Sequence, residues 1–257
     1  MYLGIDIGSI SINAVLVDSQ GRLAAWEIDR SGYDHKASAH LVVDRLCHKA
    51  AIRPEEIRRV VGTGYGRRNI QFAQETYTEI TCHAVGARAL FPDVQTVIDI
   101  GGQDSKVIRL SPQGKVEDFI MNDKCAAGTG RFLEVMAGTM GMDIASFSRC
   151  GLYAKRPFPI SSTCTVFAES EVVSGIARGV AREDLVAGIH EAIVRRIGGM
   201  ARSAGASRRV VLTGGVAKSE GIAHRLRGWF AELRIPEEPQ ITGALGAALL
   251  GWRHDHG

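Results

Sequence analysis

Three short apolar runs separated by Gly, Asp and Ser open the chain. They predict three strands joined by tight turns, at residues 2–7, 12–18 and 22–29. Apolar residues then recur every three to four positions across 35–50, which predicts a helix, and a further strand is predicted at 57–62. The chain therefore begins as a β-meander that leads into a helix and a fourth strand.

A second series of strands and helices follows the first. Strands are predicted at 95–100, 103–110, 115–120 and 208–213. Helices are predicted at about 78–90, 129–141, 166–180, 183–204, 218–231 and 242–251. Strands alternating with helices of this length indicate α/β layers. A boundary at Phe91-Pro-Asp93 divides the chain into residues 1–92 and 93–257, with the option that the last helix packs back on the first lobe.

The opening motif is repeated 93 residues further along. Val97-Ile-Asp-Ile-Gly101 matches Gly4-Ile-Asp-Ile-Gly8, so Asp6 corresponds to Asp99 and Gly8 to Gly101. The next turn keeps the same offset, because Gln113-Gly-Lys115 matches Gln20-Gly-Arg22. A register held over this length indicates an internal duplication, with a hairpin-rich set of strands opening each half.

The two Asp-Ile-Gly turns suit a nucleotide held between two similar lobes. Glycine lets backbone N–H groups approach phosphate oxygens without a Cβ in the way. Carboxylates at such turns are typical Mg²⁺ ligands, since Mg²⁺ takes few carboxylates and keeps its water. The candidate phosphate and Mg²⁺ residues are Asp6, Gly8, Ser9, Ser11, Gly101, Gly102, Gln103, Asp104 and Lys106. A third element, Thr213-Gly-Gly-Val-Ala-Lys218, joins a strand to a helix, and its Gly214, Gly215 and Lys218 are candidates for receiving the adenosine.

Together these elements resemble the actin, Hsp70 and sugar-kinase superfamily of ATPases. The resemblance implies an α/β fold of two duplicated, ribonuclease H-like lobes with the nucleotide in the cleft between them. The chain has no Gly-x-x-x-x-Gly-Lys-Ser/Thr loop, and no Gly-x-Gly-x-x-Gly follows its first strand. Other nucleotide-binding folds are therefore disfavoured.

Two cysteines stand just before helix-like runs. Cys125 lies in Asn122-Asp-Lys-Cys-Ala-Ala-Gly-Thr-Gly-Arg-Phe-Leu-Glu134, and Cys164 in Cys164-Thr-Val-Phe-Ala-Glu-Ser-Glu171. Further motifs are Gly62-Thr-Gly-Tyr-Gly-Arg67, Glu79-Ile-Thr-Cys-His-Ala84 and Asp99-Ile-Gly-Gly-Gln-Asp-Ser-Lys106, so the motifs are distributed along nearly the whole chain. They closely resemble the activator component of 2-hydroxyacyl-CoA dehydratases. That component belongs to the BadF/BadG/BcrA/BcrD-type ATPase family, which includes ATP-binding subunits of benzoyl-CoA reductase.

This resemblance implies an ATP-driven one-electron donor. It implies a homodimer with one [4Fe–4S] cluster between the subunits, to which each chain gives Cys125 and Cys164. Four thiolates are the usual ligand set, and two per chain make four across a two-fold axis. The turn Gly128-Thr129-Gly130 supplies further candidate nucleotide contacts. ATP, ADP and Mg²⁺ are the implied cofactors, ferredoxin or flavodoxin the electron donor, and an acyl-CoA dehydratase or reductase the acceptor.

Composition argues against several other classes of protein, namely nucleic-acid-binding, membrane-spanning and secreted proteins. The 257 residues are 45% hydrophobic with a net charge of +3, which leaves no basic footprint for nucleic acid. No apolar run approaches the roughly 18–20 residues that span a bilayer, and Asp6 with no basic start argues against a signal peptide. We expect a cytoplasmic protein whose cysteines are thiols or metal ligands, with no nucleic-acid or membrane partner.

Several residues carry a structural interpretation beside the functional one. Cys47, Cys82 and Cys150 are expected to be packing residues, with Cys150 in a loop, and His83 a helix-packing residue. Arg195, Arg196 and Arg202 are expected to form either a solvent-facing helix side or a docking surface for an acidic partner, and His254 and His256 a solvated tail. Arg131 and Glu134 either touch the nucleotide or pair on the surface.

Two other functions fit the same fold. A small-molecule kinase of the amino-sugar type is disfavoured because residues 32–53 leave little room for a sugar-binding insertion. A nucleotide-responsive scaffold of the actin type would need no cysteine pair. One departure from the family stands at Asn13, where a lysine is usual near the phosphates. Lys106 holds the matching position in the second half.

Overall fold

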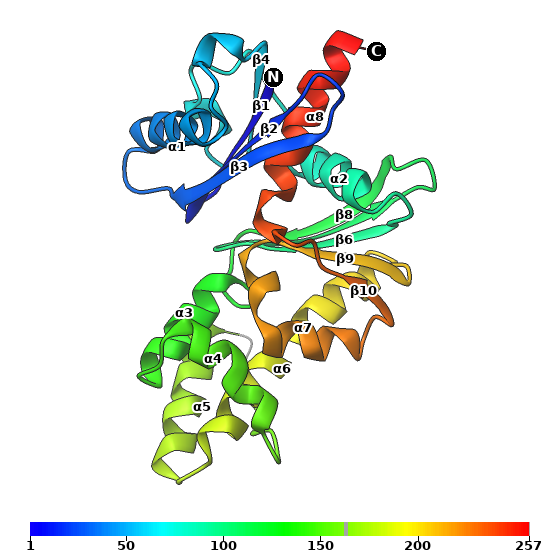
Figure 1. The fold of residues 1–257 in the computed structure, drawn as a ribbon. Helices are drawn as coiled ribbons and strands as arrows, with labels where there is room; N and C mark the ends of the chain where they lie inside the picture. Colours follow the sequence, from blue (N-terminus) through cyan, green and yellow to red (C-terminus); the bar gives the residue numbers. More distant parts are fainter. Residues whose placement is uncertain (162–163, 257) are drawn as a thin grey trace. The chain divides into compact units, whose positions relative to one another are not determined.

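The computed structural model describes residues 1–161 and 164–256 (Figure 1). The chain forms two compact units. The first unit comprises Met1–Val97, Leu110–Glu117 and Pro236–Gly257, and the second comprises Ile98–Arg109 and Asp118–Ile235. The division passes through strands of the second sheet, and the C-terminal helix belongs to the first unit.

A five-stranded sheet organises the first unit. Its order is β3-β2-β1-β4-β5, with bounds β1 Tyr2–Ile7, β2 Ser11–Val17, β3 Leu23–Arg30, β4 Arg59–Thr63 and β5 Glu75–Thr76. Strand β1 is antiparallel to β2 and parallel to β4. Every residue of β1 is buried, because helices cover both faces of the sheet there.

Side-chain alternation along β1 decides which helix each residue meets. Leu3, Ile5 and Ile7 join the core beneath α1 (His35–Lys49), whereas Tyr2 packs with the residues of α8 (Thr242–His256). Gly4 faces α8 so closely that a Cβ there would strike the backbone of Ala244. Helix α2 (Glu79–Leu90) packs beside α8, and Gly86 and Gly246 allow that approach.

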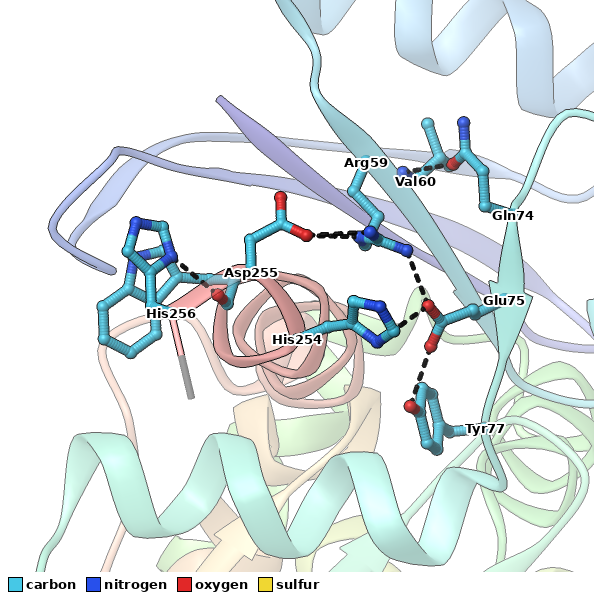
Figure 2. A network of polar contacts seen from close by, with 9 residues as sticks. Arg59, Val60, Gln74, Glu75, Tyr77, His254, Asp255 and His256 are labelled. Atoms are coloured by element: carbon cyan, nitrogen blue, oxygen red, sulfur yellow. Dashed lines mark hydrogen bonds and ion pairs between the residues drawn. The ribbon is translucent and has the colours of Figure 1, made fainter.

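The end of α8 is tied to the edge of the first sheet by a polar network (Figure 2). Arg59 contacts Asp255 at 2.8 Å and Glu75 at 2.7 Å. Tyr77 donates its hydroxyl to Glu75 at 2.8 Å, and His254 Nδ1 lies 3.3 Å from the same carboxylate. Helix α8 therefore continues five residues past the predicted end at 251. His254 and His256 are exposed, as expected, but they lie in this helix rather than in a tail beyond it.

A second five-stranded sheet has the order β10-β9-β6-β7-β8. The strands are β6 Thr96–Ile100, β7 Ser105–Leu110, β8 Val116–Asn122, β9 Arg209–Thr213 and β10 Glu232–Arg234. The helices of the second unit are α3 Gly130–Thr139, α4 Ile144–Cys150, α5 Thr165–Ala177, α6 Arg182–Ser203 and α7 Glu220–Arg227. Ile98, Ile100 and Val107 from the strands join one core with the apolar faces of these helices.

The secondary structure differs from the predicted elements at two places in the second unit. Helix α4 was not predicted. Asp143 caps it by accepting the Ser146 amide at 2.9 Å, so Cys150 ends a helix rather than lying in a loop. The helix expected at 218–231 ends at Arg227, because Gly228 caps it and Trp229 turns back to pack over Gly198. Within the described residues, no helix is long and apolar enough to cross a membrane.

Candidate functional site

The first Asp-Ile-Gly turn joins β1 to β2. The Gly8 amide donates to the Ser11 carbonyl at 2.9 Å, and Ser31 Oγ donates to the Gly8 carbonyl at 2.7 Å. Ser9 is exposed at the tip, whereas Gly8 and Ser11 are half-buried. The turn is therefore held by two hydrogen bonds and exposes Ser9 at its tip.

Two glycines enclose the carboxylate of Asp6, which is 8% exposed at the end of β1. A Cβ on Gly64 would strike Asp6 Oδ1, and one on Gly243 would strike Oδ2. Gly64 has φ +87°, so its backbone also disfavours any other residue. The backbone therefore approaches the Asp6 carboxylate closely at two positions, and glycine stands at both of them.

The second turn repeats the geometry of the first. The Gly101 amide donates to the Asp104 carbonyl at 3.0 Å, as Gly8 does to Ser11. Gly101 and Gly102 are half-buried and Gln103 is exposed, so Gln103 is the exposed residue of the second turn as Ser9 is of the first, although by the duplicated register Gln103 matches Ile10. The two hairpins predicted to be duplicates therefore share one hydrogen-bonding pattern.

Lys106 neutralises the carboxylates of the second turn. Its Nζ donates to Asp104 Oδ2 at 2.8 Å and lies 3.3 Å from Asp99 Oδ2, although the side chain is only 2% exposed. Thr213 Oγ1 donates to Asp99 Oδ1 at 2.8 Å. A buried ammonium is retained when paired in this way. The predicted residues Asp104 and Lys106 therefore lie together, joined by Asp99, a residue of the duplicated motif.

The duplication extends to a third element that sequence reasoning missed. Gly214 has φ +83° and packs against Ile100 O and Asp99 Oδ1. Gly64, with φ +87°, packs in the same way against Ile7 O and Asp6 Oδ1. The signal was present in the sequence, since Thr-Gly ends β4 as well as β9. Beyond Gly214, the exposed residues Gly215 and Lys218 begin and end a short 3₁₀ turn.

Cys125 is half-buried in a loop that a side-chain network holds. Asn122 Nδ2 donates to the Cys125 carbonyl at 2.8 Å and to the Ala127 carbonyl at 3.2 Å. Arg196 of α6 donates in turn to Asn122 Oδ1 at 3.2 Å, and its stem packs against Gly128, which has φ +83°. The loop conformation therefore depends on a residue 71 positions away in the sequence.

The helix after this loop is bonded directly to the second turn. Thr129 caps the loop by donating from Oγ1 to the Ala126 carbonyl at 2.6 Å. The amides of Gly130 and Arg131 donate to the Gly101 and Gly102 carbonyls at 2.9 and 2.8 Å. The first amides of α3 thus bind the turn that was predicted to hold phosphate.

Cys164 is exposed at the N-terminal end of α5, where its carbonyl accepts the Ala168 amide at 2.9 Å. The preceding segment is fixed at Ser161, whose amide and hydroxyl both donate to Glu171 at 2.7 Å. Arg195 of α6 donates to the Ile160 carbonyl at 2.7 Å. The neighbouring arginines 195 and 196 therefore support one cysteine segment each. Arg195 is exposed, as expected of a solvent-facing helix side, whereas Arg196 is half-buried.

The other three cysteines lie in packed environments. Cys47 and Cys82 are buried and Cys150 is half-buried. Burial raises the pKa of the Cys82 thiol to about 12, and it also raises the pKa values of Cys47 and Cys150. Such thiols stay protonated near neutral pH and are poor ligands.

Arg131 and Glu134 pair with each other at 3.1 Å on the exposed side of α3. His83 is buried at the start of α2 and lies, like Asp6, against Gly243. Within residues 1–161 and 164–256, no group of three or more His, Cys, Asp or Glu side chains is placed to hold a metal ion.

A cavity of about 740 Å³ lies apart from the predicted residues in the second unit. It is lined by Arg156, Pro157, Phe158, Pro159, Ser170, Glu171, Ser174, Arg178, Val180, Ala181 and Asp184. None of the predicted nucleotide or cluster residues lines it, so it gives no support to the nucleotide site.

Comparisons with solved structures define the class first. The chain matches component A of the (R)-2-hydroxyglutaryl-CoA dehydratase of Acidaminococcus fermentans with a TM-score of 0.95 at 38% identity, over 100% of this chain and 99% of the other. It matches the activator of the 2-hydroxyisocaproyl-CoA dehydratase from Clostridium difficile, with bound ADPNP, at a TM-score of 0.93 and 40% identity, over 100% and 96%. A ROK family glucokinase from Streptomyces griseus shares the fold alone, with a TM-score of 0.58 at 14% identity. The predicted actin, Hsp70 and sugar-kinase fold class is confirmed.

The family follows from the sequence comparisons. The 2-hydroxyisocaproyl-CoA dehydratase activator of Clostridioides difficile is 43% identical over 251 residues, covering 97% of this chain and 94% of the relative. The model of the BadF/BadG/BcrA/BcrD ATPase family matches residues 3–251. The chain therefore belongs to the BadF/BadG/BcrA/BcrD ATPase family, and the predicted ATPase activity agrees with the names of its relatives.

Proposed function

We propose that this ATPase is the activator of a 2-hydroxyacyl-CoA dehydratase or a related acyl-CoA reductase, to which it delivers one low-potential electron per cycle. The carrying observation is the arrangement of Cys125 and Cys164. Cys164 is exposed and Cys125 is half-buried, each stands just before a helix, and a separate arginine of α6 supports each segment. The protein's own relatives are named as activators of such dehydratases.

The donor chemistry fits a [4Fe–4S] cluster shared by two copies of the chain. Thiols are the usual ligands of such clusters, and two accessible thiols per chain make the usual four in a homodimer. When bound, the cluster supplies a one-electron carrier. Cys125 and Cys164 would hold it, and the N-terminal ends of α3 and α5 just beyond them would favour its negative charge.

Nucleotide chemistry is assigned to the turn residues. Asp6 and Asp104 offer carboxylates suited to Mg²⁺, which takes few such ligands and keeps its water. Gly8, Ser9, Ser11, Gly101, Gly102 and Gln103 would bind phosphates, and Gly214, Gly215 and Lys218 would receive the adenosine. Phosphoryl transfer then depends on positioning and charge neutralisation rather than on covalent chemistry.

Coupling between nucleotide and cysteine has a direct route within the second unit. The Gly101 and Gly102 carbonyls accept the first two amides of α3, and Asn122 ties the Cys125 carbonyl into the same loop. A phosphate that repositions this turn pulls on the start of α3, and with it on the segment that carries Cys125. Lys106 couples the two electrostatically. Its ammonium pairs with the Asp104 carboxylate, and a bound Mg²⁺ would compete for that carboxylate while a phosphate would compete for the ammonium.

The remaining parts of the proposal concern partners and place. A reduced ferredoxin or flavodoxin would supply the electron, and the acyl-CoA enzyme would accept it. The small net charge gives no footprint for nucleic acid, and we place the protein in the cytoplasm of an anaerobic cell.

The test is ATP-dependent activation of a partner. Protein purified without oxygen and reduced with dithionite is mixed with the 2-hydroxyisocaproyl-CoA dehydratase and its acyl-CoA, with and without MgATP. We expect dehydration only with MgATP, and no dehydration with Cys125→Ala or Cys164→Ala. Cys150→Ala is the matched control, because that thiol is half-buried at the end of α4 and should leave activation intact. Activation without ATP, or full activation by either cysteine variant, would refute the proposal.

A further inference from the structure

The cavity of about 740 Å³ in the second unit has the size and the lining of a ligand site. Small-molecule sites in proteins are clefts of roughly 300–1,000 Å³ with a mainly apolar lining and a few polar groups. The lining of this cavity combines a phenylalanine, two prolines, a valine and an alanine with two serines, two arginines and two acidic residues. We therefore asked which ligand these groups suit.

The aromatic part of the lining is held in place by the backbone. The Phe158 amide donates to the Asp184 carbonyl at 2.9 Å, and the Phe158 ring lies against Gly175 of α5, 3.4 Å from the place of a Cβ on that glycine. Prolines at 157 and 159 restrict the backbone on both sides of the ring. The half-buried Phe158 therefore offers a fixed aromatic surface.

The two acidic residues of the lining bind backbone groups and so shape the cavity. Asp184 Oδ1 accepts the amides of Lys155 and Arg156 at 2.9 and 2.8 Å. Glu171 accepts the amide and the hydroxyl of Ser161, both at 2.7 Å. These bonds fix the two carboxylates as structural groups of the wall.

The two arginines of the lining, by contrast, form no ion pair. Arg156 and Arg178 are exposed, and neither guanidinium pairs with a carboxylate within residues 1–161 and 164–256. Arg178 lies over the Phe158 ring, with 5.9 Å between its guanidinium carbon and the ring centroid. Guanidinium groups bind phosphate through paired hydrogen bonds and also stack on planar rings. The cavity thus offers two cationic donors together with a flat aromatic surface.

We propose that this cavity binds an organic phosphate that carries a planar base. The phosphate oxygens would accept hydrogen bonds from Arg156 and Arg178, and the base would lie against Phe158. A purely apolar ligand would leave both guanidinium groups unused, and a bare anion would leave the aromatic surface unused. Coenzyme A and a free adenine nucleotide both have this chemistry, and the test below distinguishes them.

The cavity is also connected to the segment that precedes Cys164. Glu171 lines the cavity and holds Ser161, which stands three residues before Cys164. A ligand that rests against Glu171 would restrict the motion of this carboxylate. Occupancy of the cavity should therefore stabilise the Ser161 contacts.

The site does not depend on the nucleotide turns proposed above, because none of their residues lines the cavity. Only the choice of coenzyme A as the first probe rests on the proposed function, in which the partner enzyme acts on an acyl-CoA. A failure of dehydratase activation would leave the binding experiment valid, and a failure of binding would leave the activation test valid. The two failures are therefore distinguishable.

Binding is measured by isothermal titration calorimetry of the full-length protein. Coenzyme A is titrated in saturating MgADP, which fills the proposed nucleotide turns, and MgADP is titrated alone in a second experiment. We expect one coenzyme A to bind per chain. Two ADP per chain in the second experiment would support the site with a free nucleotide as its occupant. No binding of coenzyme A together with at most one ADP per chain overturns the proposal.

Exposed arginines give variants that should fold and still decide the question. Arg156→Gln and Arg178→Gln should each raise the Kd of coenzyme A about 10- to 100-fold, because each removes a charge-assisted contact. Arg182→Gln is the matched control, since Arg182 is an exposed residue of α6 that does not line the cavity. A Kd that is unchanged in both cavity variants, or raised equally in Arg182→Gln, overturns the site.

The role of the ring is tested at Phe158. Phe158→Leu should weaken binding of coenzyme A but not of inorganic pyrophosphate, and Phe158→Tyr, which keeps a ring, should bind coenzyme A as wild type does. Pyrophosphate that binds as tightly as coenzyme A overturns the role of the ring. The link to Cys164 is tested by amide hydrogen exchange at Ser161, which coenzyme A should slow in wild type and not in Arg178→Gln. Unchanged exchange in wild type saturated with coenzyme A overturns that link.

Discussion

Arg196 offers a sharp test of how the second unit supports Cys125. The change is Arg196→Gln, which removes the charge-assisted bond from the guanidinium to Asn122 Oδ1 at 3.2 Å and the stem that packs against Gly128. A hydrogen bond to a charged group contributes about 1.5–3 kcal/mol, so the loop-opening equilibrium should rise by about 12- to 160-fold. Arg195→Gln is the matched control, since Arg195 is the adjacent residue on α6 and binds the Ile160 carbonyl instead.

The assay is amide hydrogen exchange of the two variants beside wild type. Exchange in the segment 122–129 should accelerate by that factor in Arg196→Gln and stay unchanged in Arg195→Gln. The Thr129 amide, which donates to the Ala126 carbonyl at 3.1 Å, is the most informative probe. Equal acceleration in both variants, or none in Arg196→Gln, would refute the idea that each arginine supports its own cysteine segment.

Three further predictions use other features of the chain. Burial lowers the pKa of His190 to about 3 in the native state, below about 6.5 in the unfolded chain, so the unfolded chain alone takes up a proton as the pH falls. His190 should therefore cost about 2 kcal/mol of stability between pH 7 and pH 5. Urea unfolding should show His190→Leu losing less over that interval, and an identical loss would contradict the assignment. Asp255→Asn breaks the pair with Arg59 (Figure 2), so Tm should fall, and fall less in 1 M NaCl because salt screens an exposed pair; a salt-independent change would argue against this. Gly64→Ala should abolish ATP binding in an equilibrium titration because its Cβ strikes Asp6, whereas Gly141→Ala, at φ +62° with nothing within 4 Å, should only lower stability by about 1 kcal/mol.

Sequence reasoning found the hairpins because the duplication is local and regular. Asp6, Gly8, Asp99 and Gly101 keep one offset, and a turn of this kind is determined by a few adjacent residues. The Gly8 to Ser11 and Gly101 to Asp104 bonds follow from that local pattern. The motif comparison located Cys125 and Cys164, which periodicity alone would not have distinguished from packing cysteines.

The contacts that complete the candidate site could not be predicted, because they join residues that are distant in the sequence. No spacing rule connects Arg196 with Asn122, 74 positions apart, or Arg195 with Ile160, 35 apart. The same holds for Gly243, whose closeness to Asp6 exists only because α8 returns to the first sheet. Charged residues on a long helix mostly face solvent, and the exposed Arg195 does so, but no local pattern predicts that it and Arg196 also bind segments distant in the sequence.

Iron and acid-labile sulfide per dimer, measured in protein kept strictly without oxygen, show directly whether two copies of the chain share a cluster. The account predicts about four irons and four sulfides per dimer in wild type and in Cys150→Ala. It predicts loss of both in Cys125→Ala and in Cys164→Ala, with ATP binding retained. Wild-type protein that holds no cluster after reconstitution with iron and sulfide would contradict the account, as would either of those two variants holding a full complement.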